Sequence, residues 1–472
     1  MENKNVILFK HFAEECHYAE TEEENKTLNG HLQCETPLGV LYVYTYAKEH
    51  LPDVNFHVFD GQAMLLENSA KGMDWNWENL LNQFKKINPS VIGIGSYYYS
   101  AAHLFHETIK RIKEVLPEVV IVAGGNYPSD VPKLVLNDDN LDYILFNEGE
   151  VIFTQFVESF MAGKEVKTLK GIAYKDSEGQ HIINEKLDFE ADLSIMPIPD
   201  RTAVPMHLYG KGRNWITRVY DEEYRALSMT ISRGCPYVCT FCTATNFWGR
   251  KIRYRDTETV LDEMQMLKEE YGADIILIED DNFLIHKKKV SEILKGMIKR
   301  NLNLKWVSNG GSNVKILNSD DEYLDLVIKS GYCMFNLAIE SSDDDTLRKI
   351  KKPLKISETV ELLEKIRTRY SHLYVNGFFI VGFPFETREQ ILNTLEFSES
   401  LNLDWCSHYL YKAFPNTELY DYCVKEGIID NFDFTYETRE YFEMGIIHGE
   451  DWTPDWVFKK NYEYNLRVNF LN

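Results

Sequence analysis

The chain has 472 residues, 44% of them hydrophobic and 26% charged, which is enough apolar content for two or three domains with their own cores. A net charge of −23 excludes a general nucleic-acid binder, because such proteins present a basic footprint. No apolar run approaches the roughly 18 residues of a membrane span, and no N-terminal signal peptide is visible. Most of the eight cysteines are scattered, as in a reduced cytoplasmic protein, so we expect a cytoplasmic location.

Short runs rich in Val, Ile and Phe alternate with helical patterns in the first third of the chain. This alternation predicts βαβ units and a parallel, doubly wound sheet. The expected strands are Val6 to Phe9, Phe56 to Phe59, Val91 to Gly95, Val119 to Ala123 and Tyr143 to Phe146.

Ligands of an open parallel sheet lie beyond the carboxyl ends of its strands. That rule selects Ser96-Tyr97, the segment Gly124-Gly125-Asn126-Tyr127, and Glu148-Gly149. Paired glycines let a backbone approach a large ligand closely, although a Gly-Gly turn is also ordinary loop geometry.

Three cysteines carry most of the chemical information in this sequence. Cys235, Cys239 and Cys242 are spaced C-x3-C-x2-C, with Phe241 just before the third. Such closely spaced thiolates suit an iron–sulfur cluster, and a cubane held by three thiolates keeps one iron open to an external ligand. The alternatives are a chance cluster of thiols and a zinc site, which needs four ligands, yet the nearest histidines are His207 and His286.

This cysteine spacing, together with Phe241, resembles the radical S-adenosylmethionine (SAM) superfamily. The resemblance implies a [4Fe-4S] cluster on Cys235, Cys239 and Cys242. It also implies that SAM chelates the open iron and is cleaved to a 5′-deoxyadenosyl radical.

The N-terminal third resembles the cobalamin-binding domain of one class of these enzymes, the class B methyltransferases. The resemblance rests on Thr36 to Tyr42, Ile121 to Gly125, and Asp142 to Glu150. It implies a Rossmann-like cobalamin domain over residues 1–165 and a connector over 166–205. The cobalamin-binding residues that it implies are Leu38, Gly39, Ser96, Tyr97, Gly124, Gly125, Asn126, Tyr127, Glu148 and Gly149.

One departure from that class concerns the lower ligand of cobalt. Many cobalamin domains carry D-x-H-x-x-G after the first strand, and His11, His17 and His31 lack this spacing. Cobalamin is therefore expected to bind without a protein ligand to cobalt, or to have been lost.

Six further strands separated by helical stretches resemble the partial (β/α)6 barrel of the superfamily, over residues 206–412. The expected strands are Leu227 to Ser232, Ile275 to Ile278, Leu304 to Val307, Met334 to Ile339, Val375 to Val381 and Trp405 to Leu410. In such barrels the active site lies at the carboxyl ends of the strands.

Segments that follow these strands resemble SAM-binding elements. Asp280 lies where the family contacts the methionyl amine, and Glu340-Ser341 looks like the element that holds the ribose hydroxyls. Gly382-Phe383-Pro384 resembles the turn beside the adenine, and Phe241 belongs to the same site. Taken alone, Glu340 would be an ordinary strand-end carboxylate and Asp280 a helix cap or surface turn.

The aromatic tail, residues 413–472, is expected to form a helical cap on the barrel or a wall of the substrate pocket. Three basic runs, 250–255, 287–289 and 348–352, are either solvated surface or a docking patch for an acidic flavodoxin or ferredoxin.

The resemblance implies a cobalamin-dependent enzyme that moves a methyl group from SAM through methylcobalamin to an unactivated carbon. One alternative is a ring-forming or rearranging radical enzyme that uses cobalamin differently or not at all. A second is a non-catalytic cobalamin or electron carrier or sensor. The substrate class stays open between small molecules, peptides and lipids, and no catalytic acid or base is nominated.

Overall fold

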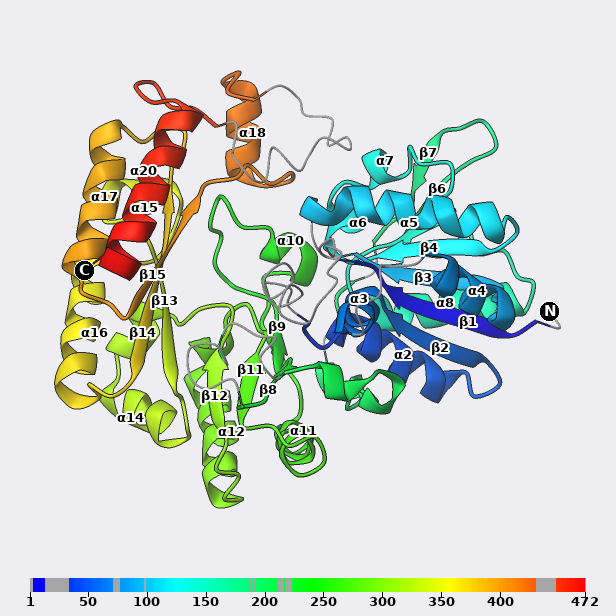
Figure 1. Ribbon diagram of the computed structural model, residues 1–472, viewed down its shortest axis with the longest axis horizontal. Coiled ribbons are helices and arrows are strands. Elements are labelled where there is room, and N and C mark those ends of the chain that lie inside the picture. Colours follow the sequence, from blue (N-terminus) through cyan, green and yellow to red (C-terminus); the bar gives the residue numbers. More distant parts are fainter. Residues whose placement is uncertain are drawn as a thin grey trace. The chain divides into compact units, whose positions relative to one another are not determined.

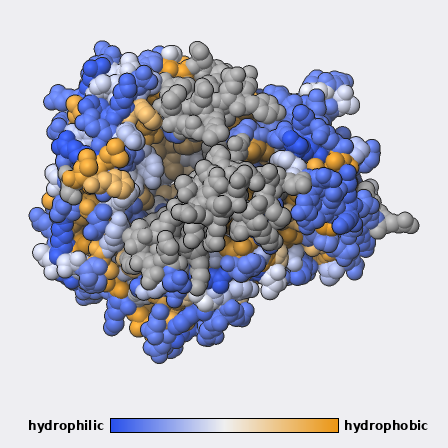
Figure 2. All heavy atoms as spheres, viewed as in Figure 1, coloured by the Kyte–Doolittle hydropathy of each residue, from blue (hydrophilic) through white to orange (hydrophobic). Residues whose placement is uncertain are grey.

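The computed structural model describes the chain except residues 1–2, 13–33, 71–76, 97–98, 187, 191, 211–215, 217–222, 430–446 and 472. The described residues divide into two compact units, one up to Ser228 and the other from Met229 (Figure 1). No helix among them is long and apolar enough to cross a membrane. Hydrophilic side chains cover much of the face in Figure 2, as expected from the high charge content.

The first unit is built on a seven-stranded sheet of order β2-β1-β3-β4-β5-β6-β7. Strands β1 to β5 pair in parallel, and β6 and β7 add antiparallel pairs at the β5 edge. The strands are β1 (Asn5–Lys10), β2 (Asn55–Asp60), β3 (Val91–Gly95), β4 (Val120–Gly124), β5 (Tyr143–Leu145), β6 (Ile172–Lys175) and β7 (His181–Ile183). All five predicted strands of this sheet are therefore confirmed.

Helices cover the sheet, and apolar side chains of α2 and α8 pack with those of the strands in one core cluster. The helices are α2 (Leu38–His50), α3 (Gly61–Ala70), α4 (Trp77–Ile87), α5 (Ala102–Val115), α6 (Asn126–Asp130), α7 (Pro132–Val135) and α8 (Gly149–Met161). Short 3-10 turns are η1 (Tyr99–Ala101), η2 (Leu193–Ile195), η3 (Arg201–Ala203) and η4 (Met206–Leu208).

The segment expected to be a connector is tied to this unit. It supplies β6 and β7, and Asp200 pairs with Lys48 of α2 at 3.0 Å. The backbone amide of Asp200 also donates to the Thr45 hydroxyl at 2.9 Å. Residues 166–205 thus extend the first sheet and pack on its helices.

The second unit contains the expected half-open barrel. Two three-stranded sheets, β12-β11-β8 and β13-β14-β15, are joined by parallel bridges from Trp306 to Tyr332 and from Ser312 to Leu337. The strands are β8 (Ala226–Met229), β11 (Ile275–Ile278), β12 (Lys305–Ser308), β13 (Met334–Glu340), β14 (Tyr374–Val381) and β15 (Trp405–Leu410). A two-residue antiparallel pair, β9 (Ser232–Arg233) and β10 (Arg253–Tyr254), flanks the first of them.

Most barrel helices start at a side-chain cap, which satisfies amides that have no partner within the helix. The capping residues include Asp256, Asn313, Asp320, Asp343, Thr387, Thr417 and Thr453. The helices are α10 (Ala244–Trp248), α11 (Thr257–Glu269), α12 (Lys287–Lys299), α13 (Val314–Asn318), α14 (Asp321–Lys329), α15 (Asp344–Lys349), α16 (Ile356–Arg369), α17 (Arg388–Ser400), α18 (Glu418–Lys425) and α20 (Pro454–Leu466), with η5 (Phe283–Ile285) before α12.

The C-terminal helix closes the free edge of β15 with an asparagine ladder (Asn461, Asn465 and Asn469). Asn469, in the π-helical turn η6 (Arg467–Leu471), exchanges two 2.8 Å hydrogen bonds with the backbone of Cys406. Asn461 and Asn465 donate to the His408 carbonyl at 3.3 and 3.4 Å, and the His408 amide donates to Asn465. Because an uncovered strand edge can pair with other chains, the ladder protects the barrel at its last strand.

We expect Asn465→Ala to lower the thermal midpoint of the second unit, because it removes the Asn465 hydrogen bonds to the His408 amide and carbonyl of β15. Each lost bond should cost about 1 kcal/mol. Lys459→Ala, at an exposed position of the same helix, is the matched control and should leave the midpoint nearly unchanged. Differential scanning calorimetry measures both, and equal midpoints for the two variants would remove the ladder's structural role.

Candidate functional site

The cysteine loop leaves β9 through a glycine that no other residue can replace without strain. Gly234 has φ of 96°, and a Cβ there would lie 2.5 Å from the carbonyl oxygen of Lys251. The amide of Cys235 then donates to the Gly249 carbonyl at 3.2 Å. The backbone of the first cysteine is thus fixed to the segment between α10 and β10.

A buried carboxylate braces the start of this loop. Asp280, which follows β11, accepts hydrogen bonds from the Ile231 amide at 2.8 Å and from the Ser232 amide and hydroxyl at 2.6 Å each. Burial raises the pKa of Asp280 to about 7, against the opposing effect of these hydrogen bonds. Both oxygens of Asp280 are therefore engaged within the chain, and its contact to the SAM amine stays a prediction.

The three thiols lie on one loop and none forms a disulfide. Asn282 Nδ2 lies 3.6 Å from Cys235 Sγ, and Cys239 Sγ lies 4.0 Å from the Lys351 carbonyl oxygen. Burial raises the pKa of Cys239 to about 11, so the ligand-free thiol is protonated and binding iron must release its proton.

This donor set fits a cluster. Within the described ranges, no three His, Cys, Asp or Glu side chains converge as ligands of a single metal ion do. In a cubane each thiolate binds a different iron, and three thiolates on one short loop match that requirement. Cys235, Cys239 and Cys242 are the residues that would hold it.

Glu340 ends β13 in a left-handed conformation. Its φ is 69°, and the register with β14 shifts between Ala338 and Glu340. The Lys352 ammonium lies 2.7 Å from Glu340 Oε1, and only 7% of Glu340 is exposed. A non-glycine residue in this region is costly and is frequent at ligand sites, which suits a carboxylate aimed at a ribose.

Ser341, the neighbour of Glu340, is oriented within the protein. It is fully buried, and its hydroxyl lies 3.2 Å from the Thr394 hydroxyl of α17 and accepts from the Asp343 amide at 3.2 Å. Its predicted contact to SAM is not tested by these bonds, which anchor the loop after β13.

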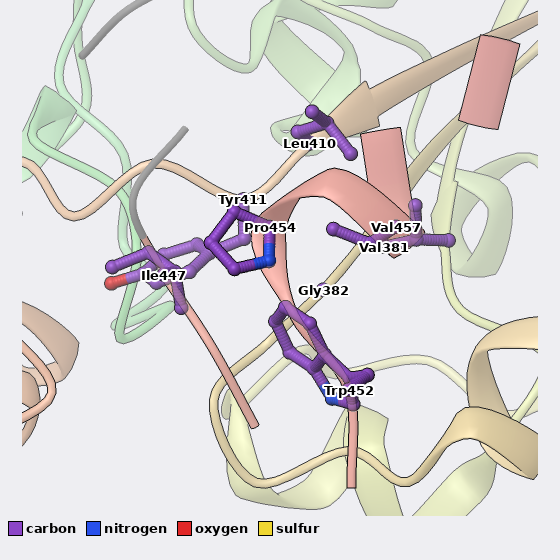
Figure 3. Close-up of a pocket in the computed structure, with 8 residues that line it drawn as sticks. All are labelled: Val381, Gly382, Leu410, Tyr411, Ile447, Trp452, Pro454 and Val457. Atoms are coloured by element: carbon purple, nitrogen blue, oxygen red, sulfur yellow. The ribbon is translucent and has the colours of Figure 1, made fainter. Parts of the chain in front are cut away.

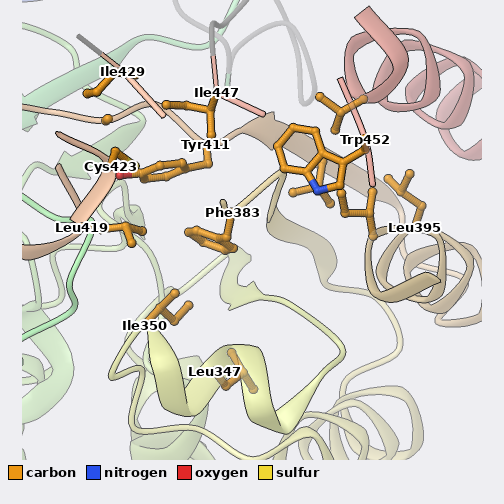
Figure 4. Close-up of a cluster of buried hydrophobic side chains, with 14 of the residues drawn as sticks. Leu347, Ile350, Phe383, Leu395, Tyr411, Leu419, Cys423, Ile429, Ile447 and Trp452 are labelled. Atoms are coloured by element: carbon orange, nitrogen blue, oxygen red, sulfur yellow. The ribbon is translucent and has the colours of Figure 1, made fainter. Parts of the chain in front are cut away.

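The Gly382-Phe383-Pro384 turn is held by its own glutamate. The amides of Gly382 and Phe383 each donate to Glu386 Oε2 at 3.0 Å, and Gly382 has φ of 84°. Phe241 from the cysteine loop contacts Phe383, with ring centroids 5.9 Å apart. The turn therefore joins the cysteine loop to the large apolar cluster around Phe383 (Figure 4).

The C-terminal tail docks on the back of the same turn. The Trp452 indole donates to the Glu386 carbonyl at 2.8 Å. Trp452, Pro454 and Val457 line a small apolar pocket together with Gly382 and the ends of β14 and β15 (Figure 3). The tail thus packs on the strand ends and also lines this pocket, so its role as a cap or as a wall of the substrate pocket stays a prediction.

In the first unit, the predicted cobalamin-binding residues lie at the carboxyl end of the sheet. The Ser96 amide, after β3, donates to the Gly124 carbonyl at 2.9 Å. Gly125 has φ of 101°, and a Cβ there would lie 2.1 Å from the Ser96 carbonyl oxygen, so this crossing requires glycine.

The other predicted cobalamin-binding residues either have open space beside them or make contacts within the chain. Gly39, on the first turn of α2, has open space where a Cβ would point, and Leu38 packs on a small apolar cluster. A Cβ on Gly149, at the start of α8, would lie 2.9 Å from a methyl group of Val43, and Glu148 accepts from the Glu190 amide at 3.2 Å. Tyr97 lies outside the described residues.

Two family models match the chain. The Radical SAM superfamily model matches residues 229–398, and the B12 binding domain model matches residues 31–157. The chain therefore carries a B12-binding domain followed by a radical SAM domain. The two domains imply a [4Fe-4S] cluster, SAM and cobalamin, and the sequence-based expectation of an enzyme is confirmed over that of a carrier or sensor.

Similar proteins are catalytic. The chain is 28% identical to cytidylyl-2-hydroxyethylphosphonate methyltransferase of Streptomyces wedmorensis, over 92% of this chain and 87% of that protein. It is 26% identical to anaerobic magnesium-protoporphyrin IX monomethyl ester cyclase of Cereibacter sphaeroides, over 73% of this chain and 54% of that protein.

The fold is that of solved cobalamin-dependent radical SAM proteins. The radical SAM methyltransferase TsrM from Kitasatospora setae, with cobalamin and [4Fe-4S] cluster bound, gives a TM-score of 0.73 at 15% identity, over 98% of this chain and 91% of that one. OxsB, a cobalamin-dependent SAM radical enzyme, gives 0.64 at 16% identity, over 99% of this chain and 61% of that one.

Sequence reasoning missed polar residues of the B12-binding domain. His11 directly follows β1, and its Nε2 lies 2.8 Å from the Ser96 hydroxyl. Burial lowers the pKa of His11 to about 3, so it is neutral. Its place at a strand's carboxyl end is the pattern that selected Ser96, and the same rule could have found it.

A second missed group is an Asp–His–Tyr chain beside the predicted Gly124–Tyr127 segment. His106 Nδ1 lies 2.7 Å from Asp138, and His106 Nε2 lies 3.0 Å from the Tyr127 hydroxyl. Tyr127 is thereby held by α5 and by the turn after α7. No sequence pattern marks these three residues, because Tyr127 and Asp138 lie 21 and 32 residues after His106.

Lys352 is the missed residue of the radical SAM domain. It lies in a basic run that was expected to be either solvated or a docking patch, yet its side chain is only 18% exposed. Burial lowers its pKa, but the charge of Glu340 and the hydrogen bond to it act against burial, and the pKa is raised overall, so the ammonium stays charged. Arg253 and Arg255 of another run are buried as well, with Arg255 paired to Glu263 at 2.6 Å.

The turn-holding glutamate leads to a pH prediction. Burial raises the pKa of Glu386 to about 8, against 4.5 for an ordinary glutamate. Between these values the unfolded chain loses a proton that the folded chain keeps, so stability falls as the pH rises from about 4.5 to 8. The slope for one such proton is at most about 1.4 kcal/mol per pH unit.

We expect Glu386→Gln, which cannot ionise, to keep the turn and to raise the thermal midpoint relative to the natural enzyme progressively between pH 5 and pH 8. Glu386→Ala leaves both amides without an acceptor and should lower the midpoint at every pH. Thermal scans across this pH range are the measurement. A pH-independent difference between Glu386→Gln and the natural enzyme would show that Glu386 is ionised in the folded state.

Proposed function

We propose that this enzyme transfers a methyl group from SAM, by way of cobalamin, to an unactivated carbon of its substrate. The carrying observation is that a loop with three cluster thiols and a cobalamin-type strand edge occur in one chain. The relative from Streptomyces wedmorensis is a methyltransferase over nearly the same length, which supports methylation as the outcome.

The bound groups supply the hard chemistry: SAM cleaved at the reduced cluster gives the hydrogen-abstracting radical, and cobalamin carries the methyl group. The protein positions them. Cys235, Cys239 and Cys242 would hold three irons and leave the fourth for SAM, and Glu340 Oε2 would accept the ribose hydroxyls.

The Gly382–Pro384 turn would lie along the adenine. Glu386 keeps its two amides fixed, and Phe241 packs on it from the cysteine loop. Cobalamin would bind in the first unit, at the carboxyl ends of the strands. The residues that would contact it there are Ser96, the Gly124–Tyr127 segment and Gly39.

Ring formation is the second candidate. The cyclase of Cereibacter sphaeroides matches 73% of this chain, so the same pair of domains is compatible with a reaction that transfers no methyl group. The two candidates predict different products from SAM, and the products decide between them.

We expect anaerobically purified enzyme, supplied with iron and cobalamin, to contain roughly four irons and one cobalt per chain. With dithionite and methyl-deuterated SAM, a methyltransferase should form both 5′-deoxyadenosine and S-adenosylhomocysteine, measured by mass spectrometry. A ring-forming enzyme should give 5′-deoxyadenosine alone.

Cys239→Ala should lose cluster absorbance and 5′-deoxyadenosine formation. Cys333→Ala, at a buried thiol before the amino end of β13, is the matched control and should keep both. Retained SAM cleavage in Cys239→Ala would overturn the assignment of the cluster.

The exposed residues Arg250 and Lys251, at the return of the cysteine loop, are proposed to dock an acidic flavodoxin or ferredoxin. Reversing both to glutamate should slow cluster reduction by flavodoxin, most at low salt, because attraction between opposite charges speeds association. Reduction by dithionite should be unchanged. Lys295→Glu, at an exposed position of α12, is the control, and equal flavodoxin rates for both variants would remove the docking patch.

A further inference from the structure

The turn after α15 carries Lys352, which pairs with Glu340, and the same turn contacts the cysteine loop. Lys352 Nζ lies 2.7 Å from Glu340 Oε1, with 18% of the lysine side chain and 9% of the glutamate side chain exposed. A pair this far out of water is screened little by salt, so each charge acts over several ångströms.

Backbone contacts place this turn directly against the cluster ligands. The Thr240 amide donates to the Ile350 carbonyl at 3.0 Å, and Cys239 Sγ lies 4.0 Å from the Lys351 carbonyl oxygen. Lys351 has φ of 55°, a left-handed kink that separates the two lysines. Lys352 is mostly buried beside Glu340, whereas Lys351 is 46% exposed and pairs with Glu418.

We propose that the buried Lys352–Glu340 pair sets the reduction potential of the cluster held by Cys235, Cys239 and Cys242, with Lys352 raising it and Glu340 lowering it. This inference rests on the cluster assigned above and adds a task for Glu340 besides ribose binding. Lys352 is not a ligand of the cluster in this scheme; it acts on the cluster through its charge.

The sign follows from charge alone. Reduction adds one electron to a cluster that already carries three thiolates, so the reduced form is the more negative one. A nearby ammonium stabilises that form and raises the potential, and a nearby carboxylate does the reverse. The pair as built nearly cancels, and the removal of either member leaves the other uncompensated.

The test is an anaerobic redox titration of the reconstituted enzyme with dithionite and mediators, followed by electron paramagnetic resonance, with no SAM present. We expect the midpoint potential to fall in Lys352→Gln and to rise in Glu340→Gln. Lys352→Arg, which keeps the charge, should stay close to the natural enzyme. Lys351→Gln is the matched control, because it removes an equal charge one residue away in solvent and should shift the potential much less.

Shifts of opposite sign in Lys352→Gln and Glu340→Gln support the proposal. An unchanged potential in both, or a shift in Lys351→Gln as large as that in Lys352→Gln, overturns it. Iron analysis separates this failure from failure of the assigned function: a natural enzyme that takes up no cluster contradicts the cluster itself, whereas a full cluster with an insensitive potential contradicts only the role of the pair.

Discussion

Buried carboxylates that accept backbone amides hold together the loops on which this enzyme depends. A loop at the end of a parallel strand has amides without partners, and water is excluded from much of this region. Asp280 supplies acceptors for the segment before the cluster cysteines, and Glu386 supplies them for the turn after β14. Each of these side chains supplies acceptors to backbone amides that are no longer paired with a neighbouring strand.

These braces explain why the acidic residues of the motifs are not all free for ligands. Asp280 and Glu386 lie at strand ends, where the barrel rule places functional groups, yet their oxygens face the chain's own backbone. Glu340 differs from both, because one of its oxygens accepts from a lysine, and among the described residues no backbone amide donates to the other. The distinction between a brace and a ligand-binding carboxylate depends on three-dimensional contacts.

The sequence was sufficient for the layout of both units. The five parallel strands of the first sheet and the six barrel strands were predictable because most of them contain a short apolar run, as β3 (VIGIG) and β11 (IILI) do. Strands β6 and β7 were missed, since they are only four and three residues long. The position of Lys352 could not be inferred, because a left-handed kink at Lys351 turns one lysine inward from a run that reads as uniformly basic. The asparagine ladder has a spacing of four residues and could have been found, but nothing in the sequence names the strand that it covers.

The hydrogen bond from the Trp452 indole to the Glu386 carbonyl ties the C-terminal tail to the turn after β14. The tail lines an apolar pocket at the strand ends, so changes there alter what the pocket admits. The same tail rests on the turn assigned to the adenine. A change in the tail that breaks this hydrogen bond would therefore act on the apolar pocket and on the turn assigned to the adenine at the same time.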